Sequence, residues 1–149
     1  MKPFLALASV FFGALGVGSG HGLNVTVYDD RIRLPQTVGS GYVTFGLENR
    51  SQGTYAHDSL RLKPGGDAEV VQRVLSRFVS GRGGEGDLET LLRHADKLVG
   101  GALGTPPGRT REVGVNLTPG TYVAVCPLPN LASGAPHFAD GMVGTFTAE

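Results

Sequence analysis

The sequence predicts an all-β protein: a β-sandwich of about seven short strands, interrupted by a two-helix insertion. Segments of alternating apolar and polar residues recur along the chain and are separated by turns rich in Gly and Pro, a pattern typical of strands. The exception is a middle region, at about residues 66–101, where apolar residues recur at helical spacing. With 149 residues, 40% of them hydrophobic, the chain suits one globular domain.

The amino-terminal segment has the pattern of a signal peptide. A positive start, Met1-Lys2-Pro3, is followed by an uncharged apolar run over residues 4–17 and by small residues suited to cleavage. We therefore predict a signal peptide over residues 1–20 and a mature domain over residues 21–149. The apolar run is too short for a transmembrane segment, and no later segment approaches the required length. The protein is expected to be exported, to the periplasm or to the outside of the cell.

Seven segments are predicted as strands. In the first, residues 23–27, apolar side chains alternate with polar ones as in a half-buried strand. The others are residues 31–34, 42–49, 57–62, 111–117, 121–126 and 141–148. In the segment that starts at His57, Leu60 and Leu62 lie on the opposite face. This parity predicts that His57 sits near an edge or end of the sheet rather than deep in the core.

The insertion is predicted to contain two helices. The first begins at Asp67, a good N-cap residue, and ends at a glycine after an apolar stripe. The second begins at Asp87 and ends at the Gly100-Gly101 pair. Its apolar stripe consists of Leu88, Leu91, Leu92, Ala95, Leu98 and Val99. His94 lies on the polar face of this helix, so we expect it to be solvated and to take no part in a site.

Charge and cysteine content exclude several classes of function. Removal of Lys2 with the signal peptide leaves 12 basic and 13 acidic residues, so the mature domain has no broad basic surface for nucleic acid or acidic lipid. The chain has one Cys, which cannot form an intramolecular disulfide. A free thiol in an exported protein is open to oxidation unless it is ligated to a metal or buried.

Three soft or borderline metal ligands follow one another near the C-terminus: Cys126, His137 and Met142. Apart from Met1, they include the only Cys and the only Met of the chain. Together these groups suit copper, which takes His and Cys in a trigonal plane with Met as a weak axial ligand. Such a site needs a second imidazole, and His57 is the upstream candidate. Taken singly, a lone Cys or Met is more typical of a protein core.

These residues resemble those of the cupredoxins, the blue copper proteins of the plastocyanin and azurin type. The Gly-x-Tyr-x-x-x-Cys pattern that ends at Cys126 resembles the plastocyanin strand that leads into the copper thiolate. The Pro-His-x-x-x-Gly-Met pattern that ends at Met142 resembles the ending of the family. The half of the chain from Val27 to His57 is similar to exported bacterial cupredoxin-like proteins of undefined role. The resemblance implies a Greek-key sandwich with one copper ion, His57, Cys126 and His137 being equatorial ligands and Met142 the axial one.

The loop between Cys126 and His137 departs from the family pattern. It has ten residues, whereas cupredoxins with established blue copper sites have only a few. Because the entropy of loop closure grows with the logarithm of length, the longer loop costs on the order of 1 kcal/mol, which is small beside copper affinity. Pro127, Pro129 and Pro136 each fix one backbone angle and restrict the loop. The loop length therefore does not exclude ligation.

The resemblance implies one-electron transfer rather than enzymatic catalysis. We expect a monomer that docks with an unidentified redox partner protein at His137, where Ala135, Pro136 and Phe138 would form an apolar patch. Two alternatives remain: a copper-storage or delivery protein whose long loop opens to release metal, and a binding module that keeps the sandwich without metal. Hydrolysis by Cys126 with His137 is disfavoured, because the sequence has no evident oxyanion loop or third orienting residue.

Overall fold

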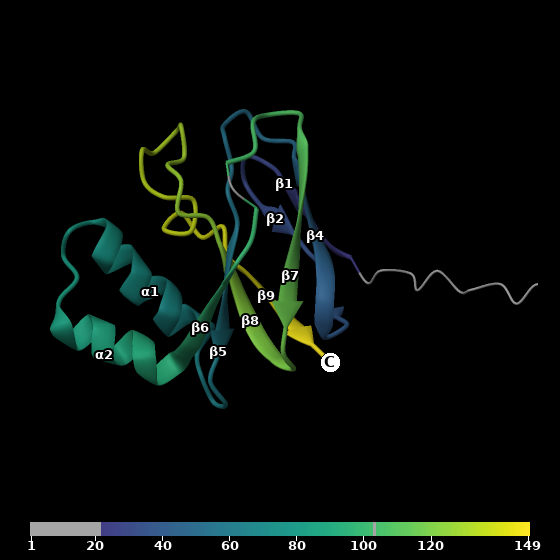
Figure 1. The fold of residues 1–149 in the computed structure, drawn as a ribbon. Helices are drawn as coiled ribbons and strands as arrows, with labels where there is room; N and C mark the ends of the chain where they lie inside the picture. Colours follow the sequence, from purple (N-terminus) through teal and green to yellow (C-terminus); the bar gives the residue numbers. More distant parts are fainter. Residues whose placement is uncertain (1–21, 103) are drawn as a thin grey trace, which may run out of the picture.

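The β-sandwich predicted from the sequence is confirmed by the computed structural model, which describes residues 22–102 and 104–149. Two β-sheets face each other, and two helices lie against the outer face of one sheet (Figure 1). The predicted signal peptide, residues 1–20, lies outside the described residues and stays a prediction. Of the helices in the described part of the chain, none is long and apolar enough to cross a membrane.

The first sheet has four strands in the order β2-β1-β4-β7. They are β1 (Leu23–Val27), β2 (Ile32–Arg33), β4 (Gly41–Asn49) and β7 (Thr110–Leu117). β1 runs parallel to β4, and the other two neighbouring pairs are antiparallel. Buried residues alternate with more exposed ones along β1, because every second side chain of a strand faces the opposite sheet.

The second sheet has five strands in the order β3-β9-β8-β5-β6. They are β3 (Thr37–Val38), β5 (Asp58–Leu62), β6 (Ala95–Gly100), β8 (Gly120–Val125) and β9 (Gly144–Ala148). β3 is missing from the predicted strands, because two residues are too few to show alternation. The last four residues of β8 are all buried, since this central strand is covered on both faces.

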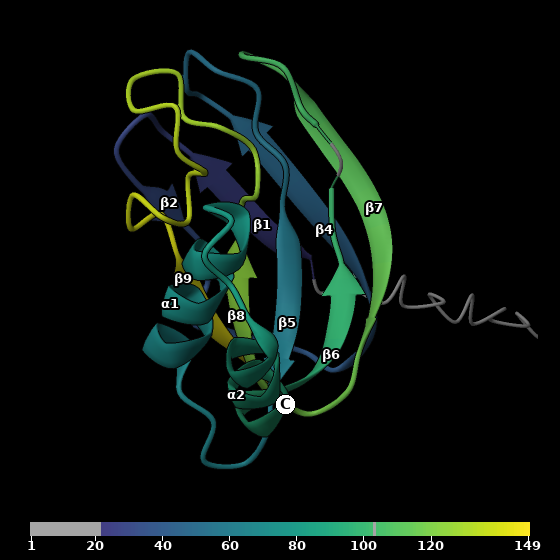
Figure 2. The same ribbon diagram turned by 90° about the vertical axis from the view of Figure 1, so that its left-hand side faces the viewer.

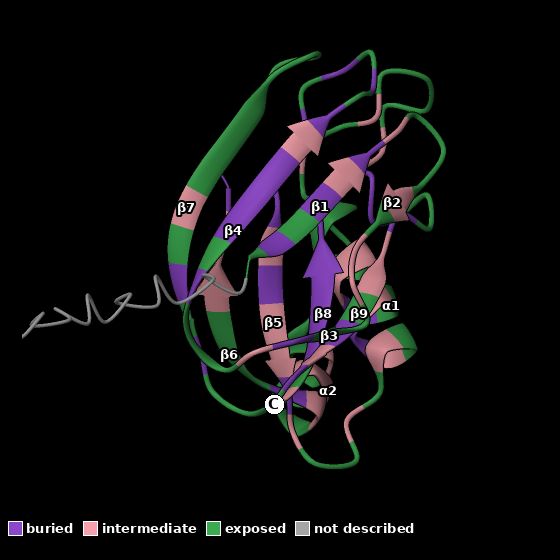
Figure 3. Ribbon diagram, turned by 90° about the vertical axis from the view of Figure 1, so that its right-hand side faces the viewer, coloured by how far each residue is buried: buried purple, intermediate pink, exposed green. Residues whose placement is uncertain are grey.

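Two clusters of buried apolar residues result from this arrangement. The larger, between the sheets, includes Phe45, Tyr122, Ala124, Cys126 and Phe146. The smaller, between the second sheet and the helices, includes Val71, Val123, Val125 and Phe138. Successive residues of β8 thus enter different clusters. Figure 3 shows the buried residues concentrated in β4 and β8, whereas most of β7 is exposed. Burying one large apolar side chain contributes about 1.5–3 kcal/mol, so both clusters stabilise the fold.

The first helix begins where the sequence predicts. α1 (Ala68–Val79) has Asp67 as its N-cap, and the carboxylate accepts hydrogen bonds from two backbone N–H groups of the first turn. Val71 and Val74 are its buried residues, and Val71 packs against Val123 and Val125 of β8. The helix therefore covers the outer face of the second sheet (Figure 2).

The second helix is shorter than predicted, and its expected end at Gly100-Gly101 is wrong. α2 (Glu85–His94) stops six residues earlier, and Ala95–Gly100 forms β6, which pairs antiparallel with β5. Ala95 is buried, but Leu98 is 64% exposed on the sheet edge. The apolar spacing over residues 95–100 is too short to distinguish a helix from a strand. The backbone N–H and C=O groups of these residues are hydrogen-bonded to β5, which lies far away in the sequence. The helices of the insertion therefore lie within residues 68–94.

His94 also differs from expectation. Its ring is half-buried rather than solvated, and Nδ1 accepts a hydrogen bond of 3.0 Å from the backbone N–H of Asp67. This contact links the end of α2 to the start of α1. His94 therefore has a structural role in the insertion.

Candidate metal centre

The four predicted ligands lie on segments that meet at one end of the sandwich. His57 immediately precedes β5, and Cys126 immediately follows β8. These two strands are antiparallel neighbours with Asp58 opposite Val125, so the register, continued by one residue, places His57 opposite Cys126. His137 and Met142 come from the segment between β8 and β9. Strand pairing therefore positions two of the predicted ligands, and a loop positions the other two.

Cys126 is fully buried and lies beside His137. Its Sγ is 3.6 Å from Nδ1 of His137 and accepts a hydrogen bond of 3.4 Å from the backbone N–H of Ala56. Burial raises the pKa of the thiol to about 11, although backbone N–H groups of Ala56 and Leu128 act in the opposite direction. The metal-free protein therefore carries a neutral thiol at pH 7.

His137 is held by its own loop. Its Nδ1 lies 2.9 Å from the carbonyl oxygen of Leu128, and its backbone N–H donates to the same oxygen at 3.0 Å. The next backbone N–H, of Phe138, donates to the carbonyl of Cys126 at 3.2 Å. The two ends of the ten-residue loop are thus joined by backbone hydrogen bonds. Figure 1 shows this loop beside the end of α1.

The loop is also anchored to α1. The side-chain amide of Gln72 donates a hydrogen bond of 2.8 Å to the carbonyl of Phe138, the residue after His137. Phe138 is only 2% exposed and packs in the cluster between the sheet and the helices. The helical insertion therefore fixes the backbone next to His137.

His57 lies at an end of its strand, directly before β5, as one part of the prediction has it, but at 1% exposure it is deeply buried, so the expectation that it lies outside the core is wrong. Leu60 and Leu62 do lie on the face opposite His57, and they pack toward the helices. The face that carries His57 is turned to the interior between the sheets, where its ring lies 4.2 Å from the ring of Phe45. Burial lowers the pKa of His57 to about 3, so the imidazole is neutral at pH 7.

The two ring nitrogens of His57 differ. Nε2 lies 2.7 Å from the hydroxyl of Ser59, whereas Nδ1 is buried and has no hydrogen-bond partner in the described part of the chain. A neutral imidazole carries one proton, and an orphaned N–H costs more than an orphaned acceptor. The favoured tautomer therefore has Nε2–H donating to Ser59 and a free lone pair on Nδ1. That lone pair suits a metal, because ligating histidines commonly bond their other nitrogen to a neighbouring group.

Met142 is buried in the same cluster as Cys126, and its backbone N–H donates to the carbonyl of His137 at 3.1 Å. The structure thus brings Cys126 and His137 into contact, with Met142 in the surrounding core. Within residues 22–102 and 104–149, however, no three His, Cys, Asp or Glu side chains gather closely enough to form a metal-binding group. The ligand set of His57, Cys126, His137 and Met142 therefore remains a prediction, with donor chemistry that fits copper.

Two residues of the site region carry no local signal in the sequence. Tyr55 is fully buried, and its ring lies 5.0 Å from that of His137. Asn49 holds the loop that leads to Tyr55. Its side-chain amide donates hydrogen bonds to the carbonyls of Gly53 and Thr105, at 2.8 and 2.7 Å. A buried Asn that bonds to backbone fixes a loop more rigidly than the Gly and Ser content of the segment suggests.

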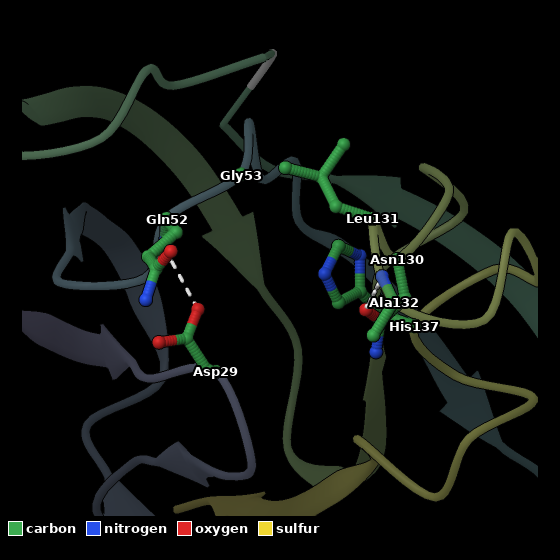
Figure 4. A pocket seen from close by; sticks show the side chains of 7 residues that line it. All are labelled: Asp29, Gln52, Gly53, Asn130, Leu131, Ala132 and His137. Carbon is green, nitrogen blue, oxygen red and sulfur yellow. Dashed lines mark hydrogen bonds between the residues drawn. The ribbon is translucent and has the colours of Figure 1, made fainter.

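The apolar patch predicted around His137 has a different composition. Phe138, expected on the surface, is buried under α1, whereas Leu131 is 77% exposed. A pocket of about 310 Å³ opens at His137, which is itself nearly buried. Its other lining residues are Asp29, Gln52, Gly53, Asn130, Leu131 and Ala132. Figure 4 shows the imidazole directed into this pocket, with Asp29 and Gln52 on one side and Leu131 on the other.

Comparisons with known proteins agree with this architecture. No family model matches the chain, and no curated protein matches it in sequence. Among solved structures, dithionite-reduced auracyanin from the photosynthetic bacterium Roseiflexus castenholzii is 21% identical, with a TM-score of 0.52 over 89% of this chain and 99% of the auracyanin. Auracyanin B is 15% identical, with a TM-score of 0.50 over 86% and 88% of the two chains. The copper protein rusticyanin is 16% identical, with a TM-score of 0.49 over 88% and 80%. The similarity to the auracyanins shows that the chain has the cupredoxin fold predicted from its sequence.

Proposed function

We propose that this chain is an exported copper protein that carries single electrons, with one copper ion bound by His57, Cys126, His137 and Met142. The observation that supports it most is the free Nδ1 of His57, a buried lone pair at the cross-strand position opposite Cys126. The contact between Cys126 and His137 supplies two further donors at the same end of the sandwich. The predicted signal peptide supports export.

The residues fit the chemistry that copper requires. Copper would supply the one-electron redox step, and a thiolate, two imidazoles and a thioether are its preferred donors in such a site. The proton on Sγ of Cys126 has to leave when metal binds, because the thiolate is the ligand. Ser59 holds the proton of His57 on Nε2, away from the metal. Burial of all four side chains excludes water and keeps their positions constant during electron transfer.

His137 is the proposed exit for the electron. It is the only one of the four that lines the pocket of Figure 4, and the exposed Leu131 stands beside it. An unidentified redox partner would dock over this pocket, with the chain itself acting as a monomer. The exposed Leu131 would give this docking surface an apolar contact beside the polar residues that line the pocket.

No catalytic role is proposed for the pair formed by Cys126 and His137. A nucleophilic cysteine has a lowered pKa and an exposed sulfur, whereas Cys126 is buried and its pKa is raised. This thiol is therefore protected rather than activated.

A metal-free binding module is the second candidate. It is favoured by one observation: no three of the acidic, His or Cys side chains in the described ranges form a metal group. A storage or delivery protein is the third possibility and differs from an electron carrier in releasing copper readily.

Copper loading separates these functions. Purified protein should retain one equivalent of Cu(II) and show intense visible thiolate charge-transfer absorption, which Cys126→Ser should abolish and the matched control His94→Ala should keep. Failure to retain copper would indicate the metal-free module. A colourless adduct that survives Cys126→Ser would exclude thiolate ligation, and rapid copper loss with slow electron self-exchange would indicate storage or delivery.

A further inference from the structure

The pocket at His137 has two walls of different chemistry. Figure 4 shows the acidic Asp29 and the amide of Gln52 on one side of the imidazole, and the apolar Leu131 on the other. The volume of about 310 Å³ is at the small end for a pocket that holds a substrate or cofactor. A polar wall, an apolar wall and a small volume suit one long side chain that is itself partly apolar and partly charged.

The carboxylate of Asp29 is fixed in position but keeps a free oxygen. Its Oδ1 accepts a hydrogen bond of 2.8 Å from the backbone N–H of Gln52, which joins the loop after β1 to the loop after β4. Its Oδ2 makes no hydrogen bond or ion pair with another residue in the described part of the chain. A strong acceptor therefore stands at the pocket without a partner of its own.

The charge of Asp29 is also uncompensated. The neighbouring charged residues form pairs among themselves: Asp30 with Arg31 and Glu48 with Arg50, both at 2.8 Å. Of the described residues that line the pocket, none is a Lys or Arg. The pocket therefore carries a net negative charge, which a cation from outside the molecule would balance.

The apolar wall depends on a close contact between two loops. Leu131 is 77% exposed, yet a Cβ atom on Gly53 would come within 3.2 Å of its Cγ. The backbone φ of Gly53 is not positive, so its conformation does not require glycine, and the missing side chain instead makes room for Leu131. The carbonyl of Gly53 accepts hydrogen bonds from the side chains of Asn49 and Ser51. The loop beneath Leu131 is thus held in place.

We propose that this pocket receives a Lys or Arg side chain of the redox partner protein, with its aliphatic stem against Leu131 and its cationic head at Oδ2 of Asp29. Lys and Arg combine a long apolar stem with a charged head, as the two walls require. The inference rests on the proposed electron-carrier function, because the bound side chain places the partner over His137, the proposed exit of the electron. The partner therefore presents a basic face, and its association slows as salt screens the attraction.

The first test needs no copper. Isotope-labelled, metal-free protein is titrated with the peptide pentalysine, and its backbone amide signals are followed by NMR. The signal of Gln52 should shift most, because a cation at Asp29 competes for the carboxylate that accepts this N–H. Asp29→Asn keeps an acceptor oxygen but removes the charge, so the affinity should fall about two- to fivefold, as for loss of an exposed ion pair.

The matched control is Asp30→Asn, which removes the same charge from the next residue, one already paired with Arg31. It should lower the affinity for pentalysine less than Asp29→Asn does. Equal affinities in the two variants, or a Gln52 signal that does not move in the unmodified protein, would overturn the inference.

The second test uses reduced, copper-loaded protein and two one-electron oxidants of opposite charge, the cation tris(phenanthroline)cobalt(III) and the anion ferricyanide. In stopped-flow measurements Asp29→Asn should slow oxidation by the cation about two- to fivefold, but not oxidation by the anion. Equal slowing with both oxidants, or the same slowing in Asp30→Asn, would overturn the inference and leave the copper function intact. Failure of the unmodified protein to retain copper would overturn the electron-carrier function, whereas the pentalysine titration would still decide whether the pocket takes a cation.

Discussion

The sulfur of Cys126 lies 3.6 Å from Nδ1 of His137, although ten residues separate the two along the chain. The contact does not depend on a short loop. Backbone hydrogen bonds from His137 to Leu128 and from Phe138 to Cys126 close the loop at its base, so its outer part can vary in length without moving the two side chains. Loop length is therefore a poor guide to whether these two groups meet.

Replacing Met142 with Leu tests the axial ligand. The two side chains have similar volume, so the free energy of unfolding should fall by less than about 1.5 kcal/mol. The protein should retain copper and its thiolate band, while the reduction potential rises because a donor that favours Cu(II) is lost. Cyclic voltammetry measures the shift. An unchanged potential would assign Met142 to core packing alone, and complete loss of copper would show that the site depends on a ligand predicted to be weak.

Replacing Ser59 with Ala tests the orientation of His57. Without the hydroxyl, Nε2 of His57 loses its hydrogen bond and the favoured tautomer is no longer fixed. Copper affinity should fall by about 10- to 100-fold, as is common when a group that orients a ligand is removed. Competitive titration with a chelator measures this. The control is Ser76→Ala, whose hydroxyl bonds within α1. Equal affinities in the two variants would argue against ligation by His57.

The pKa of His57 predicts how metal-free protein responds to acid. The folded value is about 3, below the ordinary value of 6.5, so between these values the unfolded chain binds a proton that the folded chain does not. Stability should therefore fall as the pH is lowered from about 6.5 toward 3, by an amount on the order of 3 to 5 kcal/mol. Urea denaturation at a series of pH values should show this slope. In His57→Gln the slope should be shallower, and an equal slope would place the titration elsewhere.

Replacing Gln72 with Ala tests the link between the insertion and the ligand loop. The change removes the hydrogen bond to the carbonyl of Phe138 and should lower the free energy of unfolding by about 1 kcal/mol. Copper should dissociate faster, because the backbone beside His137 is less constrained. The neighbouring Arg73→Ala, an exposed position on the same helix, is the matched control. Identical dissociation rates would show that the loop needs no support from α1.

Local sequence patterns were sufficient for most strands and for the first helix. Alternation located β1, and the capping residue Asp67 located the start of α1. The end of α2 could not be predicted, because residues 95–100 pair as a strand with β5, which lies more than thirty residues earlier in the chain. The depth of His57 was missed for a related reason: parity tells which residues share a face, but not which face meets another sheet.

The candidate ligands were identifiable because Cys, His and Met are rare here and stand at recognisable spacing. Their supports were not identifiable. Gln72 and Tyr55 contact residues that are distant in sequence, and Ser59 contacts His57, two residues away, in a way that residue spacing does not reveal. Such contacts depend on how the sheets, helices and loop pack, and residue spacing alone does not determine this packing.

The bond between Gln72 and Phe138 has a consequence for protein engineering. Loops that carry metal ligands are attractive units to transplant, since a loop that closes at its own base can be moved to another β-sandwich. Here the segment from Cys126 to Met142 rests partly on a helix from a different region of the chain. A graft that carried only this segment would leave Phe138 uncovered and the backbone beside His137 unsupported. The smallest transferable unit is therefore the loop together with α1.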